Sequence, residues 1–326
     1  MTQTITMAAS SSAILRRALL YVPASSPRML TKSLGLTSDN VTYDLEDSVT
    51  PTAKPQARAA LREHLAALSA RPPTIRELAI RVNAVSTPFA LADLTALAKL
   101  PQVDAIVVPK VNGASDLTFV TDALRHLAPE RHASSSTNPI KLIALVESAR
   151  AVMDLSSICA ASPYLSGLIF AAEDFALDMS LTRTPSLSEF LYARSAIATA
   201  ARAASLPSTI DLVCTSYKGE EGVARLEEEC RGGKAMGFNG KQCIHPSQVE
   251  TAHRLFAPDE KEVEWAVRIV IADEKAAIAG RGAWTLDGAM IDAPVVGKAK
   301  AIVAKAESCD MDIETLRNKW KDQKPE

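Results

Sequence analysis

Short apolar stretches alternate along the chain with longer amphipathic stretches. A short apolar run bounded by turn residues is typical of a buried parallel strand, whereas apolar residues spaced three and four apart indicate a helix. The helical spacing occurs in segments such as Lys54–Leu68, Ala90–Leu100, Ser115–Leu127 and Ser188–Ala204. Eight strands are predicted, at Ala18–Val22, Val41–Asp44, Leu78–Val82, Ala105–Val108, Leu142–Val146, Gly167–Phe170, Ile210–Val213 and Lys241–Ile244.

Strand followed by helix, eight times over, predicts an α/β fold of the TIM (β/α)8 barrel type, with an open doubly wound sheet as the alternative. Beyond Pro258 the pattern is helical through about Ile278, and then a glycine-rich turn and a short apolar link lead into a charged helix. We therefore expect a flexible or targeting segment at 1–16, a TIM-barrel catalytic domain at 17–280 and a C-terminal helical extension at 281–326. The length of 326 residues and the 47% hydrophobic content are sufficient for a large core.

Composition narrows the classes of partner. Lys and Arg number 36 against 38 for Asp and Glu, a net charge of −2, and no basic block is present that could follow a nucleic-acid backbone. No apolar stretch approaches the length of a membrane span, so neither nucleic acid nor membrane is an expected partner. The five cysteines are scattered, which favours reduced thiols in a reducing compartment.

The first fifteen residues are rich in Ser, Thr and Ala, contain no acid and precede the basic pair Arg16-Arg17. This composition resembles a transit peptide, which would indicate a mitochondrial protein. A disordered start fits the same residues equally well, in which case the protein would be cytoplasmic.

Carboxylates stand at the ends of three predicted strands. Glu147 follows the fifth strand, and Asp174 lies shortly after the sixth. Glu46 and Asp47 follow the second strand. In a barrel these ends meet at one mouth, where barrel enzymes place their chemistry. Mg²⁺ prefers oxygen ligands and needs few of them, so Glu147 and Asp174 are candidate ligands, with a cap on the following helix as the alternative role for either acid.

Two basic residues are predicted at the same mouth. Arg81 lies near the end of the third strand, where its guanidinium could grip a carboxylate through paired hydrogen bonds or form an ion pair with Glu46 or Asp47. Lys110 follows the fourth strand and could form a Schiff base. With carboxylates nearby, we expect Lys110 instead to be a charged group that balances the site.

Histidine adds little to the predicted chemistry. The five histidines show no close metal-ligand spacing, which disfavours zinc. His245 is the exception in position, because it follows the last predicted strand. A substrate contact and a structural polar contact both remain open for it.

Seven motifs occur in a characteristic order between Arg17 and Val296, namely Arg17-Ala18-Leu19-Leu20-Tyr21-Val22-Pro23, Asp44-Leu45-Glu46-Asp47-Ser48-Val49, Arg81-Val82-Asn83, Pro109-Lys110-Val111, Val146-Glu147-Ser148-Ala149, Glu173-Asp174-Phe175 and Gly240-Lys241-Gln242-Cys243-Ile244-His245-Pro246. Together they resemble the citrate lyase beta subunit family of the HpcH/HpaI aldolase superfamily. Within it, the chain is most similar to the stand-alone citrate lyase beta-like enzymes of mitochondria, which act as citramalyl-CoA lyases.

The resemblance implies a TIM barrel that binds Mg²⁺, an acyl-CoA thioester and a small 2-keto acid, and that assembles as a homotrimer or higher oligomer. By motif, Glu147 and Asp174 match the metal ligands of the family. Arg81 matches the arginine that steadies the oxygens of the substrate. Asp292, in Met290-Ile291-Asp292-Ala293-Pro294, matches an aspartate that reaches the site of a neighbouring subunit as acid or base.

Further contacts follow from the same motifs. Arg17 and Lys110 are expected to bind substrate, and Glu46 and Asp47 are expected to hold metal-bound water. One departure from the family is Ala24, which stands where a glycine is frequent and changes the loop after the first strand. Another is the segment 183–186, which resembles the bacterial subunits more than the mitochondrial enzymes.

The resemblance implies a Mg²⁺-dependent carbon–carbon lyase that cleaves a 3-hydroxyacyl-CoA of the citramalyl-CoA or malyl-CoA type to acetyl-CoA and a 2-keto acid. One alternative keeps the metal but uses a citryl thioester on an acyl carrier, as a citrate lyase beta subunit does, or a free hydroxy-keto acid, as class II aldolases do. A third possibility is a non-catalytic barrel that binds an acyl-CoA. The presence of both candidate metal ligands, Arg81 and Asp292 argues against this last possibility.

Overall fold

The computed structural model describes residues 14–326 and divides the chain into two compact units, Arg16–Phe256 and Ala257–Glu326. Each unit has its own hydrophobic core. The predicted segment 1–16 lies largely outside the described residues, although Arg16 is buried in the first unit.

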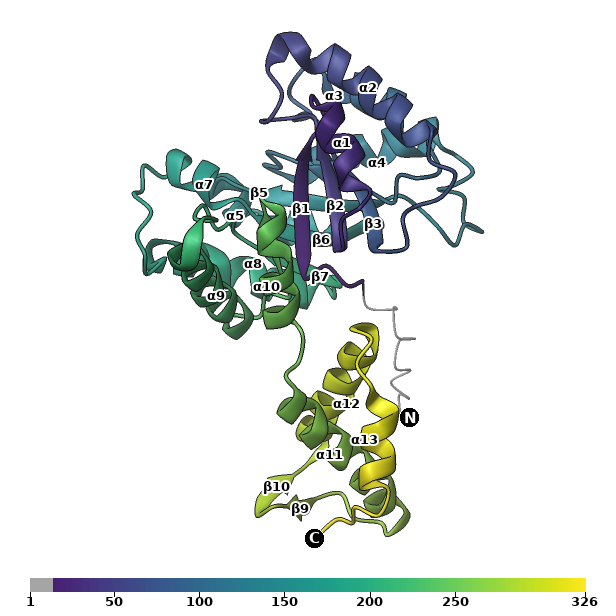
Figure 1. Ribbon diagram of the computed structural model, residues 1–326, viewed down its shortest axis with the longest axis vertical. Helices are drawn as coiled ribbons and strands as arrows, with labels where there is room; N and C mark the ends of the chain where they lie inside the picture. The colour runs from purple at the N-terminus through teal and green to yellow at the C-terminus, as the bar shows by residue number, and fades with distance from the viewer. Residues whose placement is uncertain (1–13) are drawn as a thin grey trace. The chain divides into compact units, whose positions relative to one another are not determined.

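Eight parallel strands form a closed barrel in the first unit, as Figure 1 shows for the neighbouring strands β1, β2 and β3. The first strand pairs with the second and with the eighth, since Leu20 lies opposite both Val41 and Cys243. This closure confirms the TIM-barrel prediction and rules out the open sheet. The strands are β1 (Ala18–Pro23), β2 (Ser38–Asp44), β3 (Ile75–Arg81), β4 (Ala105–Val108), β5 (Lys141–Val146), β6 (Leu165–Phe170), β7 (Ser208–Asp211) and β8 (Gly240–Cys243).

Helices form the outer layer of the barrel unit (Figure 1). The larger core lies between them and the strands, and a small core of side chains such as Leu19, Ile143 and Ile169 fills the inside of the barrel. The helical elements are α1 (Pro27–Ser33), η1 (Pro51–Ala53), α2 (Lys54–Ala66), α3 (Ala90–Leu97), α4 (Ala114–Leu127), α5 (Ala149–Met153), α6 (Leu155–Ala160), α7 (Ala172–Asp178), η2 (Ser188–Phe190), α8 (Leu191–Ala203), α9 (Gly219–Ala235), η3 (Pro246–Gln248) and α10 (Val249–Phe256).

The amino ends of the strands are closed by buried polar side chains. Arg16 forms an ion pair with Glu77 of β3 at 2.6 Å and donates a hydrogen bond to the carbonyl of Ser166 at 3.1 Å. A Cβ on Gly240 would lie 1.9 Å from the carbonyl oxygen of Arg16, so β8 can approach this end only with a glycine there. The opposite, carboxyl ends remain free for chemistry.

The second unit contains α11 (Glu260–Ile278), a hairpin of β9 (Trp284–Leu286) and β10 (Ala289–Ile291), α12 (Ala293–Ser308) and α13 (Ile313–Trp320). The unit starts at Ala257, ahead of the sequence-based boundary at 280, because α11 packs on α12 and α13. The hairpin replaces the expected short link. Asp287-Gly288 is its turn, with φ of 52° and 79°, and Asp-Gly is a known two-residue hairpin signal. Within residues 14–326, no helix combines the length and apolarity that a membrane crossing needs.

Candidate active site

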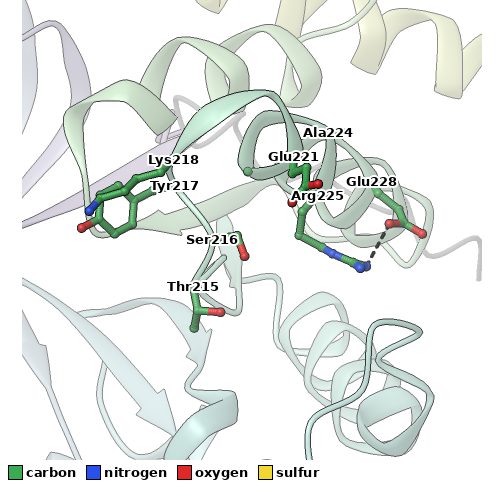
Figure 2. A pocket seen from close by; sticks show the side chains of 9 residues that line it. Thr215, Ser216, Tyr217, Lys218, Glu221, Ala224, Arg225 and Glu228 are labelled. Atoms are coloured by element: carbon green, nitrogen blue, oxygen red, sulfur yellow. Dashed lines mark hydrogen bonds and ion pairs between the residues drawn. The ribbon is translucent and has the colours of Figure 1, made fainter.

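The carboxyl ends of the strands surround a cavity of about 460 Å³ in the barrel unit. Three of the predicted site residues line it, Asp47, Arg81 and Asp174, which come from three separate strand ends. The other lining residues are Tyr21, Pro23, Asp44, Ser48, Leu145, Ala171, Ala172, Glu173, Val213, Gln242 and Ile244. A larger cavity of about 690 Å³ beside α9 has none of the predicted site residues in its wall (Figure 2).

Arg81 is held in a fixed orientation by Asp44. Its Nε and Nη2 donate to the two carboxylate oxygens of Asp44 at 2.8 and 2.7 Å, and its guanidinium lies 4.7 Å from the ring centroid of Tyr21. Burial alone would raise the pKa of Asp44, but the hydrogen bonds and charge of Arg81 hold that pKa below its usual range. Asp44 had no assigned role in the sequence analysis. Its position at the end of the predicted second strand placed it near the mouth, but its pairing with Arg81 is visible only in the β2–β3 register of the structure.

The remaining nitrogen of Arg81 faces the predicted acidic pair. Nη1 lies 3.0 Å from Glu46 Oε2 and 3.3 Å from Asp47 Oδ2. Glu46 Oε2 is buried and makes no hydrogen bond, because the contact with Arg81 lacks hydrogen-bond geometry. The ion pairs expected as an alternative for Arg81 are thus present. They leave one buried carboxylate oxygen, Glu46 Oε2, without a hydrogen-bond donor.

Lys110 joins the acids of three strand ends. Its Nζ lies 3.1 Å from Glu46 Oε1 and 3.4 Å from Asp174 Oδ1, and its backbone N–H donates to the carboxylate of Glu147. Burial opposes the charge of Lys110, but Glu147, Glu46 and Asp174 together hold its pKa above the usual range. The side chain is therefore an ammonium ion, which disfavours a Schiff base. Its φ of 50° is in the left-handed region, which is strained for a lysine.

Negative charge exceeds positive charge at this mouth. Burial, reinforced by the charge of Asp47, raises the pKa of Glu46 to about 7 against the opposing charges of Arg81 and Lys110. Burial and the charges of Asp174 and Glu46 likewise raise the pKa of Glu147. Both shifts arise mainly from burial, with a contribution from the neighbouring acids. A divalent cation would offset the excess negative charge at this mouth.

The candidate ligands match the few protein oxygens that Mg²⁺ takes, and they do not form a complete cage of protein ligands. Among residues 14–326, no group of three or more His, Cys, Asp or Glu side chains is arranged to hold a metal ion. Glu147 and Asp174 offer two carboxylates from consecutive strand ends, with Asp174 on the first turn of α7. Mg²⁺ characteristically takes one or two carboxylates and completes its shell with water and substrate.

Gln242 is a further residue of the site that the sequence analysis did not single out. Its amide nitrogen donates to the carbonyls of Phe170 at 2.9 Å and Asp211 at 3.2 Å. Its Oε1 accepts a hydrogen bond from the hydroxyl of Tyr21 at 3.1 Å. Gln242 thus joins the ends of β6 and β7 to the aromatic ring under Arg81. Its position within the Gly240–Pro246 motif was the available signal.

Arg17 does not reach this mouth, and His245 does not line its cavity. Arg17 precedes β1 and binds Asp39 of β2 at 2.8 Å, which places it at the amino ends of the strands and corrects its assignment to substrate binding. His245 does lie after β8, but its ring accepts a hydrogen bond from the N–H of Ser247 at 3.2 Å and stacks on Tyr217 at 4.9 Å. Its contacts here are structural.

Asp292 has a local role in the second unit. Its side chain accepts a hydrogen bond from the N–H of Val295 at 3.2 Å and caps the start of α12. The cap accounts for an acid beside an apolar link without any contact to a site. The role expected for Asp292 at the site of a neighbouring subunit stays a proposal.

Comparisons with known proteins extend over most of the chain. A sequence profile of the HpcH/HpaI aldolase/citrate lyase family matches residues 17–246. Citrate lyase subunit beta of Haemophilus influenzae is 35% identical over 90% of this chain and 98% of its own length. The (3S)-malyl-CoA thioesterase of Cereibacter sphaeroides is also 35% identical, over 90% and 95%. The mitochondrial citramalyl-CoA lyase of Rattus norvegicus is 31% identical, over 90% and 86%.

A solved structure agrees with the fold and contains ligands. The CitE protein of Mycobacterium tuberculosis, in complex with magnesium, acetoacetate and coenzyme A, is similar with a TM-score of 0.70 and 29% identity. The similarity covers 90% of this chain and 98% of that one. The relatives are thus named as lyases or thioesterases, and magnesium and coenzyme A occur together in one of them.

Proposed function

The chain belongs to the HpcH/HpaI aldolase/citrate lyase family, and we propose that it is a magnesium-dependent carbon–carbon lyase. Its substrate would be a 3-hydroxyacyl-CoA of the citramalyl-CoA or malyl-CoA type, and its products acetyl-CoA and a small 2-keto acid. The observation that carries the proposal is the meeting of Glu147, Asp174, Lys110 and Arg81 at one barrel mouth. The family membership supplies the class of reaction.

Glu147 and Asp174 would hold Mg²⁺, with Glu46 and Asp47 orienting the water on its open positions. When bound, the metal would polarise the hydroxyl oxygen of the substrate that becomes the ketone. Lys110 keeps its charge and holds Glu46 and Asp174 at fixed separations. That arrangement positions the two strand-end acids before substrate arrives.

Arg81 would bind the carboxylate of the 2-keto acid portion through Nη1, because Asp44 already occupies Nε and Nη2. As the carbon–carbon bond breaks, the substrate hydroxyl would pass its proton to the water held by Glu46 and Asp47, and the electron pair of the bond passes to the methylene carbon of the acetyl-CoA enolate. Positive charge fixed in advance at Arg81 favours this transition state. Asp292 of a neighbouring subunit would then give the enolate carbon its proton.

The proposal for Asp292 includes an oligomer, a homotrimer or larger, in which subunits share their sites. A citryl thioester on an acyl carrier is the second candidate substrate, supported by the similarity to citrate lyase subunit beta of Haemophilus influenzae. The name of the rat relative supports a mitochondrial location, with the cytoplasm as the alternative.

The test measures release of acetyl-CoA from citramalyl-CoA and malyl-CoA, with and without EDTA. We expect turnover that EDTA abolishes and added Mg²⁺ restores. Asp174→Asn should fold normally and lose turnover by on the order of 10²-fold or more, because it removes a ligand charge without changing shape. Normal turnover in Asp174→Asn with Mg²⁺ bound would contradict the assignment. Activity on a citryl acyl carrier alone would select the second substrate.

A further inference from the structure

The turn that carries Asp174 has no side-chain cap and is held by tertiary contacts, including the burial of Phe175 against Phe170 and Phe190. Asp174 lies in the first turn of α7, a helix of seven residues whose preceding residue, Ala171, provides no side-chain cap. Short uncapped helices depend on tertiary contacts for their position. One of these tertiary contacts is a charged connection through the residue that precedes Asp174.

Glu173, the neighbour of Asp174 in the same turn, forms an ion pair with Arg183. Nη1 of Arg183 binds Glu173, while Nη2 donates to Glu229 Oε1 at 2.8 Å and to the carbonyl of Val213 at 3.1 Å. The Arg183 side chain is only 16% exposed. One planar guanidinium thus joins the Asp174 turn to α9 and to the end of β7.

The far end of this connection is fixed in the interior. Glu229 Oε2 lies 2.9 Å from Nζ of Lys241 in β8, and both side chains are nearly inaccessible, at 4% and 0% exposure. Buried ion pairs lose their stabilisation sharply when one partner moves, so Glu229 is a rigid anchor. The segment that presents Arg183 runs between Ser180 and Leu187, both at φ of 54°, a strained backbone conformation that tertiary contacts must maintain.

We propose that Arg183 is a positioning residue for the metal site. By clamping Glu173 to the Glu229–Lys241 pair, it fixes the first turn of α7 and with it the carboxylate of Asp174. This inference rests on the proposed role of Asp174 as a metal ligand. Mutation of supporting residues of this kind typically lowers metal affinity or activity by about 10–100-fold.

Loss of the Arg183 charge would change metal binding in the opposite direction to loss of the Arg183–Glu173 contact. Arg183 is a cation close to the metal site, so its removal by itself would strengthen the attraction for a second cation. Positioning therefore predicts weaker metal binding in Arg183→Met, and simple electrostatics predicts tighter binding. Arg183→Lys separates the two, because it keeps the charge and loses the planar fork.

Arg225 provides the matched control. Its guanidinium donates to the carbonyl of Pro185 at 2.9 Å in the same segment. Its ion pair, at 3.0 Å, is with Glu228 rather than with Glu173 (Figure 2). Arg225→Met therefore loosens the segment without cutting the connection to Asp174. We expect its metal affinity to equal that of the wild type.

The experiment titrates the full-length protein with Mn²⁺ and follows free Mn²⁺ by electron paramagnetic resonance. Arg183→Met and Arg183→Lys should each raise the Kd for Mn²⁺ by about tenfold. Glu173→Gln should do the same, and Arg183→Met should have little further effect in the Glu173→Gln background, because both changes break one connection. Unaltered or tighter binding in Arg183→Met, wild-type binding in Arg183→Lys, or additive effects in the double variant would each overturn the proposal.

Two further measurements keep the outcomes distinct. If Arg183→Met fails to fold in a thermal unfolding experiment, Arg183→Lys carries the test, because it keeps the charge and loses only the planar fork that joins Glu173 to Glu229. Asp174→Asn reports on the proposed function itself. Normal Mn²⁺ binding in Asp174→Asn rejects the metal assignment, whereas lost binding there with wild-type binding in Glu173→Gln and Arg183→Met rejects only the role of Arg183.

Discussion

At the mouth of the barrel, Arg81 and Lys110 face the same acids but are held in different ways. Arg81 is fixed by a two-point contact with Asp44 and by the ring of Tyr21, so its Nη1, which pairs with Glu46 and Asp47, has a defined direction. Lys110 is a point charge between Glu46 and Asp174. The residue types followed from the sequence, but the identity of the partner that orients Arg81 did not, because Asp44 and Arg81 are 37 residues apart.

Arg81→Lys tests whether the planar fork matters. Lysine keeps the charge but cannot bind both oxygens of Asp44 and still direct a donor into the cavity, so kcat/KM should fall by about 10–10³-fold. The measurement is steady-state turnover of the CoA thioester, with Arg76→Lys on the same strand as control. Wild-type rates in Arg81→Lys would make Arg81 a structural ion-pair partner only.

The elements of the barrel were predictable because each carries a local signal. The predicted strands overlap all eight observed strands, and α2 and α4 start and end within two residues of the predicted segments. The seam between β8 and β1 carries no such local signal. It depends on Gly240, whose backbone closely approaches Arg16 only because the barrel closes.

Gly240→Ala should therefore destabilise the barrel. Its Cβ would lie 1.9 Å from a backbone oxygen that cannot move cheaply, so the free energy of unfolding should fall by about 1–3 kcal/mol or more. Gly232→Ala in α9 is the control, because its Cβ meets nothing within 4 Å and alanine favours a helix by about 0.5–1 kcal/mol. Urea unfolding compares the two. Equal stability of both variants would show that the seam tolerates a side chain.

At the scale of the whole molecule, the proposed metal ligands and the proposed acid belong to different units of the chain. Glu147 and Asp174 belong to the unit Arg16–Phe256, whereas Asp292 belongs to Ala257–Glu326, where it caps α12. A lyase that uses all three residues needs Asp292 at the barrel mouth, from its own chain or from a second copy. We propose the second arrangement.

Asp292→Asn separates capping from acid chemistry, because asparagine caps a helix about as well as aspartate but cannot donate the proton. The variant should fold, assemble and bind Mg²⁺ and acyl-CoA, yet lose most turnover. Mixing it with inactive Asp174→Asn subunits should restore part of the activity, since some mixed sites would combine intact metal ligands with an intact Asp292. Turnover after subunit exchange, with sedimentation to record assembly, is the measurement.

Complete subunit exchange without any rescue would exclude the shared site. A fully active monomer would exclude it more directly. Asp292→Ala provides the comparison for capping, because it should cost about 1 kcal/mol of stability in addition to any loss of turnover. Equal turnover in the alanine, asparagine and wild-type proteins would leave Asp292 with its capping role alone.

The sequence by itself determined the alternation of strands and helices, the acids and cations at the strand ends, and the family. These are local properties, since backbone periodicity and residue type can be recognised within a few neighbouring positions. Only the tertiary structure decided that Asp44 orients Arg81, that Arg17 lies at the opposite end from the site, and that Arg183 connects Glu173 to Glu229. Such partners are set by the register of strands and the packing of helices far apart in the chain, which no local pattern records.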